Sequence, residues 1–257
     1  MIKILHLYNN LLNLYGEYAN MVLLKKHLAD QNIKVEVITA DSAADVRLED
    51  FQFIYIGAGT ERKQKLALAD LQTRRDDIVH CIESGTNMLL TGNSFEMLGR
   101  VIVDADGVEH SGLCCFDFSV TEQSQKRLTG DVTADCAMIP ATLVGFVNKC
   151  STIIFGQDSA EPDAKPQAAA IPASAIKSFC TVKRGLGNDN VAPDEGIRYK
   201  NLCGTHLTGP LLVKNPLLLD WLVKKLAESS DTKGFVFTPH DYPNENDAYA
   251  VTLQKLG

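Results

Sequence analysis

The first 90 residues alternate between short apolar runs and longer amphipathic segments. Strand-like runs occur at 2–7, 35–39, 53–56 and 87–90, and apolar residues follow a helical spacing over 18–29 and 62–84. Strands that alternate with helices along a chain pair in parallel through right-handed crossovers. The alternation therefore predicts an α/β fold with a mostly parallel sheet, and one long helix over 62–84.

Two glycine-bearing loops directly follow predicted strands. Gly57-Ala58-Gly59 ends the run at 53–56, and Thr91-Gly92-Asn93 ends the run at 87–90, before a helix expected from Ser94. Ligands of parallel α/β sheets bind beyond the carboxyl ends of the strands. A strand–turn–helix element in that place often carries a nucleophile. The two loops are therefore the candidate site, although glycine occupies the apex of the second.

The remaining chain favours further β segments and little helix. Strands are expected at 101–103, 116–120, 126–133, 143–148, 175–184 and 202–207, and a helix at 217–228. Residues 157–174 are rich in Ala, Pro, Asp and Ser, which is typical of an exposed loop or insertion. We expect one domain over 1–232 and a C-terminal arm over 233–257.

Composition excludes several classes of function. The net charge is -7, and an acidic surface disfavours nucleic acid and anionic membranes. No apolar run approaches the roughly 20 residues that span a bilayer, and the N-terminus does not resemble a signal peptide. The seven cysteines show no metal-binding spacing and are expected to be reduced, mostly buried thiols of a cytoplasmic protein.

Five segments together resemble class I glutamine amidotransferases of the CobB/CobQ type, and within them the GatD-like subunits. They are LYNNLLNLYGEYAN (7–20), IGAGTERKQ (56–64), LLTGNSFEMLG (89–99), LVGFVNKCST (143–152) and GIRYKNLCGTHLTGPLLVKNPLLLDWLV (196–223). The family typically reads Cys-Gly-Gly-Tyr-Gln-Leu-Leu-Gly after the strand and Gly-Thr-Tyr-Leu-His-Gly-Pro later. The segments follow the family's order from residue 7 to about 224, and their combination is specific.

The resemblance implies a three-layer α/β domain that carries additional β segments. In the family, a cysteine thiolate attacks the side-chain amide of glutamine, and a histidine activates the thiol and protonates the departing ammonia. It also implies a Mur-ligase-like partner that amidates a cell-wall precursor. ATP and Mg²⁺ would then belong to that partner, with no cofactor on this chain, whose crevice would take a small amide such as glutamine.

Registering the motifs residue by residue leaves the catalytic positions without catalytic groups. The family's cysteine falls on Gly92 and its histidine on Thr208. The Glu and His of the middle segment fall on Val147 and Lys149, and a substrate-holding arginine falls on Ser151. The family's Tyr before the histidine falls on His206. Because three independent positions have changed, we predict negligible glutaminase turnover by the ordinary route.

Other side chains could replace the missing groups. Ser94 lies two residues past the apex, where a structural role in the first helical turn is the alternative. His206 would share a face with Thr208 on an extended strand, about 7 Å away; a hydrogen-bonded or surface histidine is the alternative. A hydrolase using this pair is a third functional hypothesis. Cys203 would face the opposite side from His206 and is not expected to be a nucleophile.

The glycine loops also allow two interpretations. Gly57, Ala58, Gly59 and Asn93 form the oxyanion-side loop implied by the family, which would donate backbone N–H groups to a carbonyl. The alternative is a tight strand-to-helix connection that persists without catalysis. Asn93 with Glu96 resembles a capping box, and Glu195 has the context of a surface charge.

Besides that hydrolase, two main functional hypotheses follow from the sequence. The first is a GatD-like subunit of a ligase that amidates a cell-wall precursor, lacking ordinary glutaminase activity. The second is a non-catalytic binding or scaffolding protein outside cell-wall synthesis.

Overall fold

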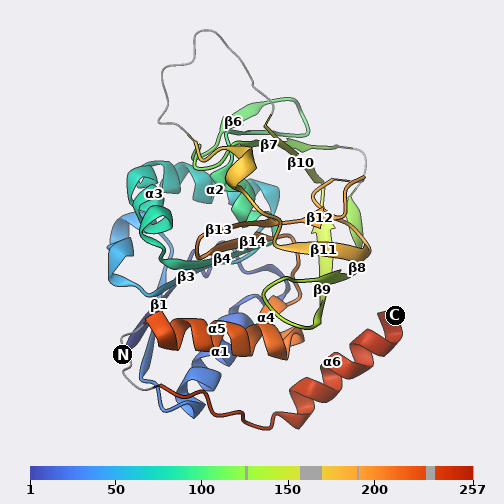
Figure 1. Ribbon diagram of the computed structural model, residues 1–257. Helices are drawn as coiled ribbons and strands as arrows, with labels where there is room; N and C mark the ends of the chain where they lie inside the picture. The colour runs from blue at the N-terminus through green and yellow to red at the C-terminus, as the bar shows by residue number, and fades with distance from the viewer. Residues whose placement is uncertain (125–126, 157–169, 190, 230–234, 257) are drawn as a thin grey trace.

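A six-stranded sheet forms the centre of the computed structural model, which describes residues 1–124, 127–156, 170–189, 191–229 and 235–256 (Figure 1). The strand order is β13-β14-β4-β3-β1-β2. The strands are β1 (Ile2–Leu7), β2 (Val35–Ala40), β3 (Phe53–Ile56), β4 (Asn87–Thr91), β13 (Ile197–Tyr199) and β14 (Leu202–Thr205). All neighbours pair in parallel except β13 and β14. The predicted α/β class with a mostly parallel sheet is confirmed.

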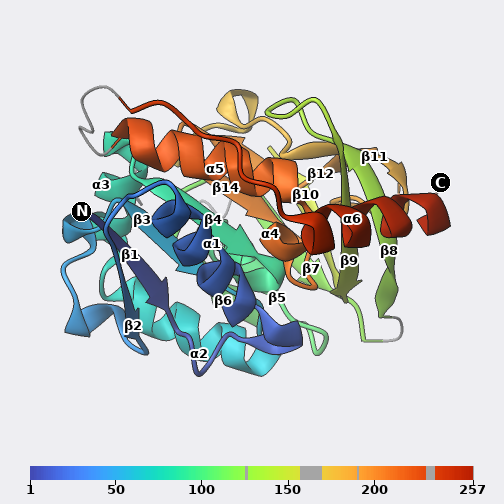
Figure 2. The same cartoon turned by 90° about the horizontal axis from the view of Figure 1, so that it is seen from below.

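Helices cover both faces of this sheet (Figures 1 and 2). One face packs against α1 (Tyr18–Asp30), α4 (Leu211–Lys214) and α5 (Pro216–Ser229), and the other against α2 (Glu61–Gln72) and α3 (Arg75–Ser84). Alternate strand residues point to opposite faces, so Tyr55 joins the apolar cluster beneath α1 and α5, whereas Ile54 and Ile56 join the cluster beneath α2 and α3. Two cores on one sheet give the three-layer arrangement.

The single helix predicted over 62–84 is wrong, because the chain forms two. Thr60 caps α2 by accepting a hydrogen bond from the Lys63 backbone N–H. The helix ends where the Thr73 hydroxyl donates to the Asp70 carbonyl at 2.7 Å, and Arg74 leaves helical geometry at φ -123° and ψ 22°. The apolar stripe continues through both helices, so periodicity alone did not reveal the break.

Two four-stranded sheets flank the central one (Figure 1). One has the order β10-β7-β5-β6, with β5 (Val101–Val103), β6 (Glu109–Ser111), β7 (Phe118–Glu122) and β10 (Ser151–Phe155). The other has the order β12-β11-β8-β9, with β8 (Leu128–Asp135), β9 (Thr142–Lys149), β11 (Cys180–Arg184) and β12 (Asp194–Glu195). Strand β5 has the predicted bounds, and the other predicted middle strands are present with shifted ends. Strands β6, β10 and β12 were not predicted, and β11 is shorter than the run at 175–184.

The chain ends in a helical arm. Residues 235–242 have no regular structure, and α6 (Pro243–Leu256) follows. His27 of α1 stacks on Tyr242 with ring centroids 3.9 Å apart, and its Nε2 lies 3.0 Å from a Glu245 carboxylate oxygen. The Tyr249 hydroxyl donates to the Thr142 carbonyl at 2.6 Å. The arm therefore bridges the α1 layer and the β8–β9 edge (Figure 2).

The predicted insertion at 157–174 is described only over 170–174, since 157–169 lie outside the described residues. Residues 233–234 and 257 of the predicted arm lie outside them as well, and the predicted domain boundary stays a prediction. Within the described ranges, no helix is both long and apolar enough to cross a bilayer.

Candidate functional site

The turn after β4 has the backbone geometry of a nucleophile elbow. Gly92 takes φ +63°, a left-handed conformation that glycine adopts without steric cost. A 3₁₀ segment, η4 (Gly92–Leu98), follows directly. The helix expected from Ser94 is therefore a 3₁₀ segment that begins two residues earlier. No side chain caps it, so the predicted capping box is wrong.

The space in front of this turn is filled by the neighbouring loop. A Cβ atom built on Gly92 would lie 2.4 Å from the Ala58 Cβ and 3.3 Å from the Thr208 Cγ2. Real Cβ atoms do not approach a neighbour to 2.4 Å, so a side chain at position 92 requires the loop to move. The Leu14 backbone N–H holds that loop by donating to the Ala58 carbonyl at 2.9 Å. The Ala58 methyl group thus occupies the nucleophile position.

One backbone N–H of the oxyanion-side loop is hydrogen-bonded within the chain. The Gly59 backbone N–H donates to the Asn93 side-chain carbonyl at 3.1 Å. A Cβ at Gly57 would lie 2.5 Å from the Leu12 carbonyl oxygen, so this position accepts only glycine. An amide oxygen from the elbow itself therefore receives the N–H that would face a substrate carbonyl.

Thr208 lies beside Gly92, as the family register implied, but it carries no base. Its hydroxyl donates to the Phe146 carbonyl at 2.9 Å, and the backbones of these two residues form a β-bridge. The structure thus brings together the two positions on which the sequence register sets the family's nucleophile and base, and neither residue carries such a group.

A buried carboxyl lies directly beneath the elbow. Glu17 is fully buried and accepts hydrogen bonds from the Tyr55 hydroxyl at 2.5 Å, from the Thr91 hydroxyl and from the Gly209 backbone N–H at 3.3 Å. Burial raises its pKa, although these donors oppose the rise. Because Thr91 precedes Gly92 and Gly209 follows Thr208, this carboxyl fixes their spacing. Glu17 lies in the segment 7–20 that resembles the family's opening, but no sequence pattern indicated a role for it.

Ser94 is not arranged as a displaced nucleophile. Its side chain is fully buried, and its hydroxyl is bonded to two backbone carbonyls, those of Thr91 at 2.8 Å and Ile56 at 3.1 Å. These contacts fasten the start of η4 to the end of β3. They suit the structural alternative for this residue.

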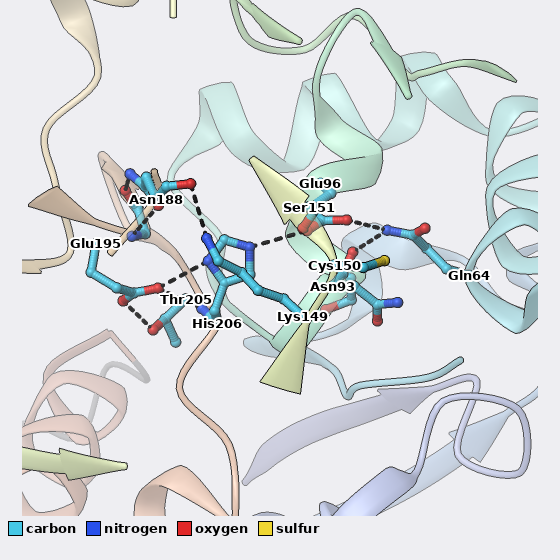
Figure 3. Close-up of polar contacts among 12 residues, drawn as sticks. Gln64, Asn93, Glu96, Lys149, Cys150, Ser151, Asn188, Glu195, Thr205 and His206 are labelled. Atoms are coloured by element: carbon cyan, nitrogen blue, oxygen red, sulfur yellow. Dashed lines mark hydrogen bonds and ion pairs between the residues drawn. The ribbon is translucent and has the colours of Figure 1, made fainter. Parts of the chain in front are cut away.

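His206 lies between two carboxylates rather than beside Thr208 (Figure 3). Its Nε2 is 3.0 Å from Glu96 and its Nδ1 is 3.3 Å from Glu195. The His206 backbone N–H also donates to Glu195 at 2.7 Å. Exposed fractions of 1% for His206, 1% for Glu96 and 0% for Glu195 place all three groups in the interior. The prediction that Glu195 is a surface charge is wrong.

Two further polar side chains complete this group, which we call the His206 cluster: Glu96, Lys149, Ser151, Glu195 and His206. The Ser151 hydroxyl donates to Glu96. The buried Lys149 ammonium donates to the Gly187 and Asn188 carbonyls at 2.6 and 2.9 Å. Burial lowers the pKa of Lys149, although the charges of Glu96 and Glu195 oppose this shift.

Glu195 is held as a carboxylate despite complete burial. Burial raises its pKa, but hydrogen bonding to His206 and the charge of His206 outweigh this, so the pKa lies below its usual value. The Thr205 hydroxyl adds a hydrogen bond at 2.6 Å.

Four members of this cluster stand where the sequence departs from the family's motifs: Glu96, Lys149, Ser151 and His206. Considered singly, each of these four residues indicated only that a side chain of the family's motif had been replaced. In the structure they contact or electrostatically influence one another. Gln64 links the cluster to the elbow, because its amide N–H₂ donates to Glu96 at 2.8 Å and to the Asn93 backbone carbonyl at 2.5 Å.

Neither region resembles a metal centre. Among the residues that the structure describes, no group of three or more His, Cys, Asp or Glu side chains could hold a metal ion. Cys203 is 6% exposed and lies in the apolar cluster beneath α1 and α5, away from the elbow's polar contacts.

Known proteins give this geometry its context. Residues 3–216 match the CobB/CobQ-like glutamine amidotransferase domain. The chain is 31% identical over 251 residues to the lipid II isoglutaminyl synthase (glutamine-hydrolyzing) subunit GatD of Staphylococcus aureus, covering 97% of this chain and 93% of that protein. It is 27% identical over 225 residues to GatD of Streptococcus pneumoniae, covering 86% and 79%.

A solved structure shares the fold at much lower identity. PurLQS from Thermotoga maritima superposes with a TM-score of 0.54 at 9% identity, covering 89% of this chain and 98% of that one. At this identity the likeness concerns the fold alone. The family match over most of the chain, and the 31% identity over nearly its whole length, establish the relationship: the chain belongs to the CobB/CobQ-like glutamine amidotransferase family.

Proposed function

We propose that this protein is a GatD-like subunit that supports amidation of a cell-wall precursor without hydrolysing glutamine itself. The relatives are named as subunits of a glutamine-hydrolyzing lipid II isoglutaminyl synthase, and the similarity spans nearly the whole chain. One observation supports the absence of glutamine hydrolysis most directly. A Cβ built on Gly92 would lie only 2.4 Å from the Ala58 Cβ, so the present loop leaves no room for a nucleophilic side chain there.

Glutamine hydrolysis by this family's chemistry needs a thiolate, a base and free oxyanion donors. Gly92 has no side chain, the Thr208 hydroxyl is bonded to a backbone carbonyl, and the Gly59 N–H is bonded to Asn93. Losing nucleophile and base together lowers turnover by many orders of magnitude. The crevice therefore lacks the groups that the ordinary reaction needs, and binding of a small amide such as glutamine there stays a prediction.

The partner under this proposal is a Mur-ligase-like subunit that binds ATP and Mg²⁺. This chain would contribute a binding surface for the partner rather than catalytic groups, so no cofactor is assigned to it. The preserved elbow, clamped by Glu17, would then serve to keep the domain's shape for the complex.

The test is a glutaminase assay on the full chain, alone and with a co-purified ligase-type partner. We expect ammonia release at background level in both cases, and co-elution of the two proteins. The GatD of Staphylococcus aureus with its own partner is the positive control. Sustained ammonia release by this chain would contradict the non-hydrolysing role.

Deleting the gene and measuring amidation of lipid II tests the biological part of the proposal. We expect lower amidation, which reintroducing the unmodified chain restores. A deletion that leaves amidation unchanged, together with no ligase in the complex, would instead favour a scaffolding role outside cell-wall synthesis.

A further inference from the structure

Strand β2 leaves one edge of the central sheet open. It is the outermost strand and pairs with β1 alone, beside which Figure 2 shows it. At the opposite edge, the Lys177 and Arg198 backbones exchange hydrogen bonds, so β13 has a neighbour there. Over the described part of the chain, no strand or bridge pairs with the outer side of β2.

The backbone groups of alternate residues point out of this edge. The Ile2 N–H donates to the Lys34 carbonyl at 2.8 Å, and the Tyr8 N–H donates to the Ala40 carbonyl at 2.6 Å. The register between these two bonds is unbroken, and every second residue of a parallel strand bonds to the same neighbour. Even-numbered residues of β2 therefore bond to β1. The outward N–H and C=O groups belong to Val35, Val37 and Thr39.

Strand β2 has few of the features that keep an edge strand from pairing. Edges are usually protected by proline, by a bulge or by several charged side chains. Strand β2 has no proline and no bulge, and Glu36 is its single charged residue. Its apolar side chains, such as Val37 and Ile38, are only half-buried. A regular, largely apolar edge of this kind is a template for another strand.

Helix α1 carries a second apolar stripe besides the one that it buries. Tyr18 and Val22 are 53% and 62% exposed, and the exposed Lys25 and Ala29 continue the stripe at helical spacing. A helix that is apolar on two sides has a further surface to bury.

Contacts of α1 show which way this stripe faces. The Leu212 N–H donates to the Asn20 side chain at 2.8 Å, and the His27 Nδ1 lies 3.9 Å from Asp220, so α4 and α5 lie on one flank of α1. Helix α5 covers β4 and β14, with which it lines a cavity. The stripe lies about half a turn around α1 from Asn20 and His27. It therefore faces away from the middle of the sheet, on the side of β2.

The C-terminal arm leaves the stripe uncovered. It contacts α1 through Lys26, His27 and Asp30, which lie on other sides of the helix. Strand β2 packs against the same apolar cluster as α1, so the stripe and the open edge adjoin. We call them together the β2 surface: Tyr18, Val22, Lys25, Ala29, Val35, Val37 and Thr39.

We propose that the β2 surface is the interface of a homodimer, in which β2 pairs antiparallel with β2 of a second copy. A two-fold axis perpendicular to the sheet relates the copies. Val37 pairs with itself across this axis, and Val35 pairs with Thr39 of the second copy. All three are outward-facing residues, so each pair exchanges N–H···O=C bonds. The two central sheets become one, and the α1 helices pack side by side on the same face.

Charge favours a second copy as the occupant. The exposed Lys34 and Asp41 stand at opposite ends of β2, and antiparallel pairing brings each near the opposite charge of the other copy. Glu36 lies opposite Ile38 rather than opposite another carboxylate. Around this surface Lys25 and Lys34 balance Glu36 and Asp41, although the chain carries a net charge of -7. The β2 surface therefore escapes the repulsion that an acidic chain imposes on its own association.

Sedimentation of the full chain without any partner tests the proposal. We expect an equilibrium between monomer and dimer whose dimer fraction rises over about a hundredfold range of protein concentration. A chain that stays monomeric throughout would overturn the homodimer. Loss of co-elution with a ligase-type partner in an edge variant of such a monomer would assign the edge to that partner instead.

A proline at the two-fold axis tests the strand pairing. Val37→Pro removes an N–H that β1 does not use, and proline is tolerated on an edge strand at such a position. Dimer dissociation should be about tenfold or more easier, because the bonds at the axis are lost. The matched control is Glu109→Pro on the edge strand β6, where the Asp104 N–H bond to Val108 shows that the Glu109 N–H also points outward. It should dimerise as the unmodified chain does.

A charge on the stripe tests the helix contact without altering a strand. Val22→Asp should weaken the dimer about tenfold or more, because a carboxylate is desolvated in the interface. Leu66→Asp, at a position of α2 that is 56% exposed, is the matched control and should have no effect. A dimer that survives both Val37→Pro and Val22→Asp would place the interface elsewhere and overturn the proposal.

A cross-link tests the register. Residues that exchange hydrogen bonds across an antiparallel pair have Cα atoms about 5.5 Å apart, which a disulfide spans. Val37→Cys should therefore give a covalent dimer under mild oxidation, whereas Leu66→Cys and the unmodified chain should not. A Val37→Cys chain that cross-links no faster than Leu66→Cys would contradict the pairing of Val37 with itself.

Discussion

The elbow at Gly92 and the His206 cluster are neighbours joined by Gln64, yet they are built in opposite ways. At the elbow, where the family keeps its reactive groups, the chain has a methyl group, a glycine and a threonine in contact. In the cluster, where the family's motifs read Gln, His, Arg and Tyr, it has Glu96, Lys149, Ser151 and His206. Small side chains in contact at one place therefore coincide with a group of buried polar side chains at the other.

The difference teaches that the departures from the family pattern are coupled. A buried carboxyl group is tolerated when partners satisfy it, and His206, Ser151 and Gln64 together satisfy Glu96. The elbow needed no such compensation, because a small apolar contact can replace a side chain at low cost. We infer that packing by Ala58 closes the elbow above the hydrogen-bonded Glu17 carboxyl, whereas paired polar groups hold the cluster together. Substitutions in each region separate these contributions.

Replacing His206 with alanine is expected to have the largest effect. It leaves the buried Glu96 and Glu195 side chains without the imidazole that lies between them, and removing one partner of such a buried polar pair costs about 3–5 kcal/mol of unfolding free energy. Chemical denaturation measures the loss. The combined variant Glu96→Gln, Glu195→Gln, His206→Gln removes the charges together and should lose less than the single change. If His206→Ala lowers the unfolding free energy no more than a substitution at an exposed position, the cluster contributes little to stability.

Gly92→Cys should come next, because the loop blocks the new side chain. Overpacking against Ala58 and a non-glycine residue at positive φ together cost about 2–4 kcal/mol. Adding Ala58→Gly removes the closest contact and should recover part of this loss, so that the two effects are non-additive by about 1 kcal/mol or more. A double-mutant cycle on unfolding free energies measures this coupling. Strict additivity would mean that the loop moves aside from the new side chain at no cost in free energy.

The sequence predicted the scaffold far better than the cluster. Strands β1 and β3 were predicted to the residue because apolar residues dominate both, as in strands that are buried on both faces of a parallel sheet. The proximity of Gly92 and Thr208 followed from the family register. The closure by Ala58 could not be predicted, since it depends on how closely one loop approaches another.

Glu195 shows why the cluster was missed. It lies in a loop rich in glycine, asparagine and aspartate, a composition typical of the surface. Only the short pairing of β12 with β11, which sets Glu195 opposite Cys180, carries it into the interior. A usable signal was the joint change of Glu96, Lys149, Ser151 and His206, since four new polar groups at interior motif positions need one another.

The two regions should also respond to pH in opposite directions. The pKa of Glu195 is lower in the folded chain than its ordinary value of 4.5, so its stabilising contribution is complete above that pH and lost as pH falls through the folded value. The pKa of Glu17 is raised above 4.5, so its ionisation opposes folding as pH rises. Relative to the unmodified chain, Glu17→Gln should therefore gain stability with rising pH and Glu195→Gln should lose it. Unfolding free energies across the acid range measure both, and parallel profiles would contradict the contrast.

Asn93→Ala is expected to have the smallest effect and asks whether the elbow is closed by packing alone. It removes one hydrogen bond from the Gly59 N–H at a half-buried position, which costs about 0.5–1.5 kcal/mol. If the Ala58 contact holds the loop, the fold persists while the Gly59 amide exchanges its hydrogen faster, and Asn93→Asp, which keeps an acceptor oxygen, retains the protection. Amide hydrogen exchange resolved at Gly59 distinguishes the cases. Faster exchange throughout residues 57–59 would show that the loop depends on Asn93, and that a polar contact closes the elbow as it organises the cluster.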